Sequence, residues 1–231
     1  MGEHSNTLTI DSTASPADTS ASVFAQAYND LRNLILAGEF ELNHRLTEAE
    51  LTRRLDVSRG TVRAVTARLA QEGYLTSEPH RGVRTREFTI DEAMEILETR
   101  EVLEAALAGL AAERASDEQL AELGKTLEMM AIAEREHAAS DYSGLNRHFH
   151  QQVREAADQA TMTAFVDSLH YPLVMRQYRD QTTLHPRRNS LNEHLAILYA
   201  LQTRNAEAAS AAMRHHVESA RRALLLSTRP R

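Results

Sequence analysis

Three histidines that are far apart in the chain share one feature: each falls on or beside the apolar stripe that helical periodicity predicts for its segment. These residues are His150, His194 and His216. Asn146 precedes His150 by four residues, a spacing that lets two side chains on one helix face share a ligand. Imidazole nitrogen is a common ligand of Zn, Ni, Fe and Mn. The pattern leaves two interpretations open: a divalent metal site, or core histidines that each satisfy a hydrogen bond, which is the commoner situation.

Arg100 lies inside another apolar helix face, together with Leu97, Leu103 and Leu107. A guanidinium group among leucines needs a partner, because an unpaired buried charge costs a large amount of free energy. Glu104, one helical turn later, is the simplest partner. Alternatively, Arg100 faces a cavity in which its N–H groups bind the carboxylate of a small molecule.

An arginine-bearing helix is predicted from Ser58, a good N-cap, to about Glu72, with Gly73 ending it. Its apolar stripe consists of Val62, Val65 and Leu69. The opposite arc contains Gly60, Arg63, Ala64 and Ala67, with Arg59 at its edge. Small side chains let a helix enter a DNA groove, and arginine donates to guanine O6 and N7 or binds phosphate. The helix is therefore a candidate for DNA recognition.

A short helix and a hairpin flank this arginine-bearing helix. Thr47 and Glu50 fit a capping box that begins a helix ending near Leu55, and a tight turn at Asp56-Val57 follows. After the arginine-bearing helix, residues 74–77 and 83–85 favour strands, with turn-forming residues between them. This order predicts a winged helix-turn-helix. The residues at the hairpin tip, which are placed to reach a minor groove, are His80, Arg81 and Gly82.

The rest of the chain has helical spacing, few Gly or Pro residues and no strong strand signal. Helices are predicted at 91–114, 117–138, 141–157, 160–179, 189–203 and 205–226. Charge divides the chain in the same way: residues 51–86 contain eight arginines and three acidic residues, whereas residues 87–231 contain 16 basic and 22 acidic residues. We therefore expect a mainly α protein, with a winged helix-turn-helix domain at 21–87 and an all-helical bundle of about six helices at 88–228.

Composition limits the class of protein further. With 26 basic and 33 acidic residues the formal net charge is −7, so that any surface that binds anions must be local. The absence of Cys excludes disulfides and thiolate metal sites. No apolar run is long enough to span a membrane and no signal peptide is evident, so we expect a soluble, cytoplasmic protein. Residues 1–20 are poor in apolar side chains and are expected to form a disordered tail.

Residues 36–83, LAGEFELNHRLTEAELTRRLDVSRGTVRAVTARLAQEGYLTSEPHRGV, resemble the N-terminal domain of the GntR family of bacterial transcription factors. Val57-Ser58-Arg59 and Val62-Arg63 correspond to the recognition helix of that family, and residues 72–75 lead into its wing. The resemblance implies that double-stranded DNA is a partner. The residues that we expect to contact DNA are Ser58, Arg59, Thr61, Arg63, His80, Arg81 and Gly82.

Residues 90–226 resemble the FCD domain, the all-helical C-terminal partner in the FadR subfamily of GntR regulators. The matching pieces are LETREVLEAALAGLAAERA, LNRHFHQQVREAA, NEHLAILYAL and AEAASAAMRHHVESA. In members that bind metal, the ligands are an Asp, a His four residues later and two further His. Carried over to this chain, those positions are Asn146, His150, His194 and His216, with Asn in place of the acidic ligand. The resemblance implies a divalent metal cofactor, such as Zn or Ni, and a small carboxylate effector with Arg100 as its charge partner.

These features together predict a ligand-responsive transcription factor without enzymatic activity. A homodimer on a palindromic operator is expected, because two-fold DNA sites mirror protein symmetry, and the resemblance implies repression. One alternative is a helical metalloenzyme with three histidine ligands and a DNA-binding appendage, in which the metal activates water. Such an enzyme needs a general base, and Glu193, next to His194, lies about 100° away around the helix. Another alternative is an architectural protein that bends DNA without sequence preference.

Overall fold

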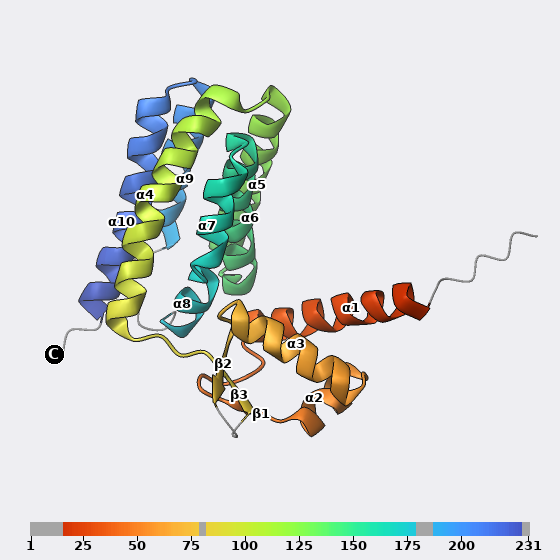
Figure 1. Ribbon diagram of the computed structural model, residues 1–231. Helices are drawn as coiled ribbons and strands as arrows, with labels where there is room; N and C mark the ends of the chain where they lie inside the picture. Colours follow the sequence, from red (N-terminus) through yellow and green to blue (C-terminus); the bar gives the residue numbers. More distant parts are fainter. Residues whose placement is uncertain (1–15, 79–81, 179–186, 228–231) are drawn as a thin grey trace, which may run out of the picture. The chain divides into compact units, whose positions relative to one another are not determined.

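The computed structural model describes residues 16–78, 82–178 and 187–227, and it divides the chain into two compact units between Arg86 and Glu87. Each unit contains buried apolar side chains of its own. The described elements confirm a mainly α protein, with a winged helix-turn-helix in the first unit and an all-helical bundle in the second (Figure 1). No helix within the described ranges is long and apolar enough to cross a membrane.

The first unit combines three helices with a small antiparallel sheet. Its elements are α1 (Pro16–Ala37), β1 (Arg45–Leu46), α2 (Glu48–Leu55), α3 (Arg59–Gln71), β2 (Leu75–Glu78) and β3 (Gly82–Thr85). The strand order is β1-β3-β2, so the predicted hairpin β2–β3 gains a third strand through the pairs Arg45↔Arg84 and Leu46↔Val83. Strand β1 is not predicted from the sequence, because its two residues are too few for an alternating pattern to be visible.

Side-chain caps begin α2 and α3 at the predicted residues. Thr47 Oγ1 accepts a hydrogen bond from Glu50 N at 3.2 Å, which is the first half of the predicted capping box. Ser58 Oγ accepts one from Thr61 N at 3.1 Å. Such bonds satisfy N–H donors that the first turn of a helix otherwise leaves without a partner. The predicted stripe of α3 is buried at each of its positions, Val62, Val65 and Leu69.

Helix α1 begins earlier than the sequence indicates. It starts at Pro16, inside the segment 1–20 for which composition predicts a disordered tail. Proline is favoured in the first turn of a helix, where its missing N–H has no acceptor to serve. Residues 1–15 lie outside the described ranges. Further along, α1 packs against α3 and buries Leu31 and Ile35, which lie four residues apart on one face of the helix.

The second unit is a bundle of helices around α4. Its elements are α4 (Ile90–Arg114), α5 (Asp117–Arg135), α6 (Ala139–Ala157), α7 (Ala160–Ser168), α8 (Tyr171–Gln177), α9 (Arg187–Gln202) and α10 (Ala206–Ser227). Figure 1 shows α4 alongside α10, and α4 also packs against α6 and α9. Small residues on α4 permit this close packing: a Cβ atom at Gly109 would lie only 3.3 Å from the Ala206 carbonyl oxygen. Helix α4 therefore brings together the helices that carry the three histidines.

The prediction of one helix at 160–179 is wrong. The segment forms two helices, α7 and α8, with a break at His170, whose φ is +54°. Pro172 accounts for the break, because it has no N–H to donate to the preceding turn and cannot continue α7. The described part of the second unit consequently has seven helices, rather than the predicted six or so.

The predicted inward face of α9 is also partly wrong. The spacing of Leu191, Leu195 and Leu198 predicts that they share one inward face of α9 with His194, yet Leu195 is 49% exposed, whereas His194, Ile197 and Leu201 are buried. The apolar residues of α9 extend around more than one face, so periodicity alone leaves the buried face uncertain by about one residue. Contacts with α4, α5 and α10 decide it.

Candidate metal centre and nucleic-acid interface

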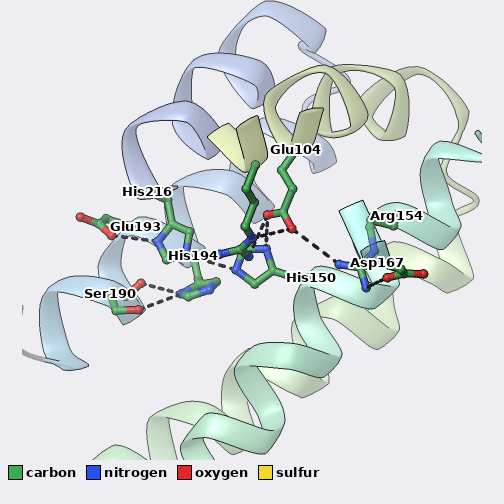
Figure 2. A network of polar contacts seen from close by, with 9 residues as sticks. Glu104, His150, Arg154, Asp167, Ser190, Glu193, His194 and His216 are labelled. Atoms are coloured by element: carbon green, nitrogen blue, oxygen red, sulfur yellow. Dashed lines mark hydrogen bonds and ion pairs between the residues drawn. The ribbon is translucent and has the colours of Figure 1, made fainter. Parts of the chain in front are cut away.

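The three histidines predicted as metal ligands come together in the interior of the second unit. His150 on α6, His194 on α9 and His216 on α10 are buried, and one potential ligand nitrogen from each lies within 4.8 Å of the other two (Figure 2). The Nε2 atoms of His150 and His216 are 3.2 Å apart. These residues meet because α6, α9 and α10 all pack against α4.

Each imidazole is held from the outside through its Nδ1 atom. The contacts are His150 Nδ1 to Glu104 Oε2 (2.7 Å), His216 Nδ1 to Glu193 Oε2 (2.9 Å) and His194 Nδ1 to the Ser190 carbonyl oxygen (2.6 Å). Carboxylate and carbonyl contacts of this kind are the usual supports of metal-binding histidines, because they set the ring orientation and the tautomer. His194 Nε2 is buried and has no hydrogen-bond partner within the described part of the chain, and the contact of His150 Nδ1 with Glu104 is a close ion-pair contact that does not have hydrogen-bond geometry.

Burial keeps the three imidazoles neutral. Loss of solvation lowers the pKa of His150 to about 4, although the Glu104 carboxylate favours the charged form. Burial also lowers the pKa of His194 well below its ordinary value, and it lowers the pKa of His216 despite the hydrogen bond to Glu193. Neutral imidazole is the form that binds a metal ion. The site therefore presents three ligand-competent nitrogens at neutral pH.

The donor set fits a divalent metal ion. Three imidazole nitrogens with further positions open are a known arrangement for Zn, and imidazole also suits Ni and Fe. The unpartnered His194 Nε2 points the same way, since a buried polar atom without a partner costs free energy. Asn146 is half-buried on α6, one turn before His150, and its place in the ligand set stays a prediction.

Arg100 is paired as the simpler sequence interpretation proposes. Its Nε and Nη2 atoms donate to the two carboxylate oxygens of Glu104 at 3.0 and 2.9 Å, and the pair is buried. The ring of Tyr171 covers the guanidinium, with its centroid 3.5 Å from Cζ. Burial alone would raise the pKa of Glu104, but Arg100 and His150 hold it well below its ordinary range. Arg100 Nη1 is buried without a hydrogen-bond partner among the described residues.

Two carboxylates that support the histidines cannot be recognised from sequence spacing. Glu104 is predicted only as a partner of Arg100, because its contact with His150 joins α4 to α6. Glu193 points away from its neighbour His194, as its position on the helix predicts, and thereby reaches His216 on α10. Both roles become visible only when the helices are paired.

In the first unit, the predicted DNA-contacting residues lie at the N-terminal end of α3. Ser58, Arg59 and Arg63 are exposed, and Thr61 is half-buried, with its hydroxyl oxygen 2.9 Å from that of Ser58. Arg63 donates from Nε and Nη2 to the carboxylate oxygens of Glu48 on α2, at 2.6 and 3.1 Å. The arginines thus lie on the surface of the unit and not in its core.

The wing contributes one described residue to the predicted interface. Gly82 is exposed, with a φ of +87°, a backbone conformation that strongly favours glycine. His80 and Arg81 lie outside the described residues, so their role at the tip stays a prediction. The hairpin itself, β2 and β3, is present after Gly73 as predicted.

Two family profiles match the chain. The profile for bacterial regulatory proteins of the gntR family matches residues 24–84, and that for the FCD domain matches residues 95–219, more than half of the chain. This chain belongs to the GntR family. It joins a GntR helix-turn-helix domain to an FCD domain, as the resemblance of its two segments predicts. It is a DNA-binding transcriptional regulator.

Similar proteins match this GntR-family regulator over nearly their whole length. It is 26% identical over 211 residues to the HTH-type transcriptional repressor RspR of Escherichia coli (strain K12), with 91% of each chain covered. It is 27% identical over 229 residues to the HTH-type transcriptional regulator BphR of Paraburkholderia xenovorans (strain LB400), with 93% of each chain covered.

Solved structures share the fold. E. coli McbR/YncC matches with a TM-score of 0.78 and 21% identity, over 90% of this chain and 99% of that one. A GntR-type regulator from Rhodococcus sp. RHA1 matches with a TM-score of 0.73 and 24% identity, over 90% of this chain and 100% of that one. At these identities the likeness shows the fold alone.

Proposed function

We propose that this regulator is a repressor whose binding to DNA is controlled by a small carboxylate effector and a divalent metal ion in the second unit. The proposal rests on the convergence of three buried imidazoles, each held through Nδ1, on a centre where His194 Nε2 has no hydrogen-bond partner among the described residues. Histidines with a purely structural role are expected to have satisfied nitrogens instead.

His150, His194 and His216 would hold the metal ion, with the Asn146 amide oxygen as a weaker fourth ligand. When bound, the ion supplies a Lewis-acidic centre with open positions for a carboxylate oxygen. Glu104 and Glu193 keep two of the rings oriented and make their Nε2 atoms better ligands. All of the proposed ligands are nitrogen or oxygen atoms, which is consistent with a chain that contains no Cys.

Arg100 supports a carboxylate as the effector. Burial is the largest cause of the lowered pKa of each of the three histidines, and the positive charge of Arg100 is a further cause for all of them. Arg100 therefore lies within electrostatic range of the site. Glu104 occupies Nε and Nη2, while Nη1 is a buried donor without a hydrogen-bond partner in the described residues. A carboxylate that binds Nη1 satisfies this donor, and charge-assisted bonds of that kind are stronger than neutral ones.

The effector changes DNA occupancy only if it binds two states of the protein with different affinity. We propose a homodimer that presents two winged helices to a palindromic operator, with the second unit as the dimerising part. Residues Ser58, Arg59, Thr61 and Arg63, together with the wing, contact that operator. Repression is supported by the name of the similar E. coli protein, the transcriptional repressor RspR.

Regulation rather than catalysis is supported by the engagement of the two nearby carboxylates. Glu104 contacts His150 and Arg100, and Glu193 contacts His216, so both are used to hold imidazole rings. A general base must instead be within reach of the proton that it abstracts. We therefore propose that the protein is not an enzyme. As a regulator of transcription, it is proposed to act on DNA in the cytoplasm.

The test uses the full chain purified without chelator. Bound metal is measured by mass spectrometry, and a panel of small mono- and dicarboxylates is screened for shifts in melting temperature with and without EDTA. A ligand that binds only the native state raises thermal stability, so we expect metal-dependent shifts for a subset of the panel. The same compounds should change affinity for a duplex selected by the protein from random DNA. The proposal is overturned if neither Zn nor Ni binds when it is added to the purified protein and no carboxylate in the panel then shifts the melting temperature.

A further inference from the structure

Arg63, one of the two α3 arginines predicted to contact DNA, is held by a carboxylate on another helix. Arg63 Nε donates to Glu48 Oε1 at 2.6 Å and Nη2 donates to Oε2 at 3.1 Å, although the two side chains are 70% and 44% exposed. Exposed ion pairs contribute little to stability. The main consequence of this pair is therefore the orientation and the charge of the guanidinium, and not the stability of the fold.

The geometry of the pair leaves one edge of the guanidinium available. Arginine carries five N–H donors in a planar fork. Glu48 occupies Nε and one hydrogen of Nη2, so Nη1 and the other Nη2 hydrogen still form a fork of the kind that binds guanine O6 and N7. The carboxylate also neutralises the charge that would otherwise attract phosphate. The pair thus favours binding to a base over binding to the backbone.

Glu48 and Arg63 border a groove that the wing also lines. The groove has a volume of about 520 Å³, and its walls come from α2, α3 and the strands of the first unit. Gly82, the wing residue predicted to contact DNA, is part of its lining, as is Ala67 from the exposed arc of α3. The carboxylate therefore lies on the same surface as residues predicted to contact DNA on two separate elements.

We propose that Glu48 is a specificity-determining residue for DNA: its carboxylate orients Arg63 toward a guanine and limits binding of Arg63 to phosphate at unrelated sequences. The inference rests on the proposed contact of Arg63 with the operator. If Glu48 has this role, removal of its carboxylate has two effects that the loss of a purely structural contact would not have. Removal of the carboxylate weakens discrimination between sequences while it strengthens binding to unrelated DNA.

The experiment compares the full-length parent with Glu48→Gln, Arg63→Ala and the double variant. Each selects from random DNA duplexes, and each is titrated by fluorescence anisotropy, over a range of salt concentrations, with the duplex that the parent prefers and with a shuffled duplex. For Glu48→Gln we expect about tenfold weaker discrimination, centred on the base pair that Arg63→Ala also affects. Affinity for the shuffled duplex should rise, with a salt dependence steeper by about one phosphate contact.

Two controls accompany this comparison. The double variant should lose no more discrimination than Arg63→Ala, because both changes act on one contact. Glu39→Gln removes another exposed pair of the same unit, that with Arg54 at 2.9 Å, and should keep the base preferences of the parent. Melting temperatures of all variants show whether the first unit remains folded.

The outcomes separate this inference from the proposed role of Arg63. Unchanged base preferences in Glu48→Gln, with altered ones in Arg63→Ala, overturn the role of Glu48 and leave that of Arg63 standing. Unchanged preferences in Arg63→Ala overturn both roles. A parallel fall in affinity for both duplexes in Glu48→Gln, with a lower melting temperature, makes Glu48 a structural residue and also overturns the inference.

Discussion

Glu104 Oε2 lies 2.7 Å from His150 Nδ1 (Figure 2). The same carboxylate accepts two hydrogen bonds from Arg100, so one buried side chain joins the proposed effector arginine to a proposed metal ligand. Arg154 Nη1 lies 3.6 Å from Glu104 Oε1, the other oxygen of this carboxylate, and Arg154 Nη2 lies 3.3 Å from Asp167 Oδ1 on α7. Glu104 therefore links α4 to His150 on α6, and Arg154 links Glu104 to Asp167 on α7.

Removal of a histidine from the cluster is expected to abolish metal binding. His194→Ala and His150→Ala each leave two imidazoles, so the metal-dependent part of the rise in melting temperature should disappear along with the bound metal. His148→Ala is the matched control, because its side chain is exposed on α6 and is not part of the cluster. Mass spectrometry of the purified proteins and melting curves with and without EDTA provide the readout. Equal metal content in all three variants contradicts the site.

Glu193→Gln is expected to weaken metal affinity by about 10–100-fold, because the neutral amide supports the His216 ring less well than the carboxylate does. Glu193 is only partly buried, so the variant should still fold. Glu218→Gln, which removes the i,i+4 partner of Arg222 on α10, is the control for a lost charge on this part of the surface. Competition titrations with a Zn-binding dye measure the affinities. Identical values for the parent and Glu193→Gln would show that His216 does not depend on this carboxylate.

Metal-free protein is expected to lose stability as the pH falls from about 6.5 toward 4. Burial lowers the pKa of His150 from 6.5 to about 4 in the folded protein. Below pH 6.5 the unfolded chain therefore takes up a proton that the folded chain does not. Because the pKa of His150 is lower in the folded state, its contribution to the free energy of unfolding is fully present above pH 6.5. This contribution is lost as the pH falls from 6.5 toward 4. Urea denaturation in EDTA at a series of pH values measures the free energy of unfolding.

Two variants make this pH dependence specific to the buried histidine. His150→Gln should show a smaller loss of stability between pH 6.5 and 4 than the parent, because it lacks the group that titrates. His215→Gln, at the exposed neighbour of His216, should follow the parent. A parent whose stability stays constant over this range would mean that His150 is accessible to solvent in the folded protein.

Ser58→Ala is expected to cost about 1 kcal/mol of stability in the first unit, because Thr61 N loses its acceptor at the start of α3. Ser58→Thr keeps a hydroxyl at the N-cap and should retain most of this stability. The midpoint of urea denaturation checks the effect. If Ser58 also contacts DNA, Ser58→Ala should lower affinity for the selected duplex under conditions where the variant is fully folded. A midpoint equal to that of the parent would mean that the cap contributes nothing.

Local patterns in the sequence determined most of the elements of this protein and most of their inward faces, but not β1 or the break between α7 and α8. The N-cap at Ser58, the end of α3 at Gly73 and the buried stripe of that helix depend on hydrogen bonds and periodicity within a few residues. The inward positions of His150 and His194 follow from periodicity for the same reason. Where apolar residues surround a helix more evenly, as around Leu195, periodicity was insufficient to identify the buried face.

Tertiary packing alone decided which distant residues meet. The histidine cluster, the contact of Glu104 with His150 and that of Glu193 with His216 depend on how α6, α9 and α10 pack against α4. The pair of Glu48 with Arg63 likewise joins two helices of the first unit. Periodicity within one helix carries no information about which face of another helix it will meet, because that choice comes from the burial of whole faces against one another.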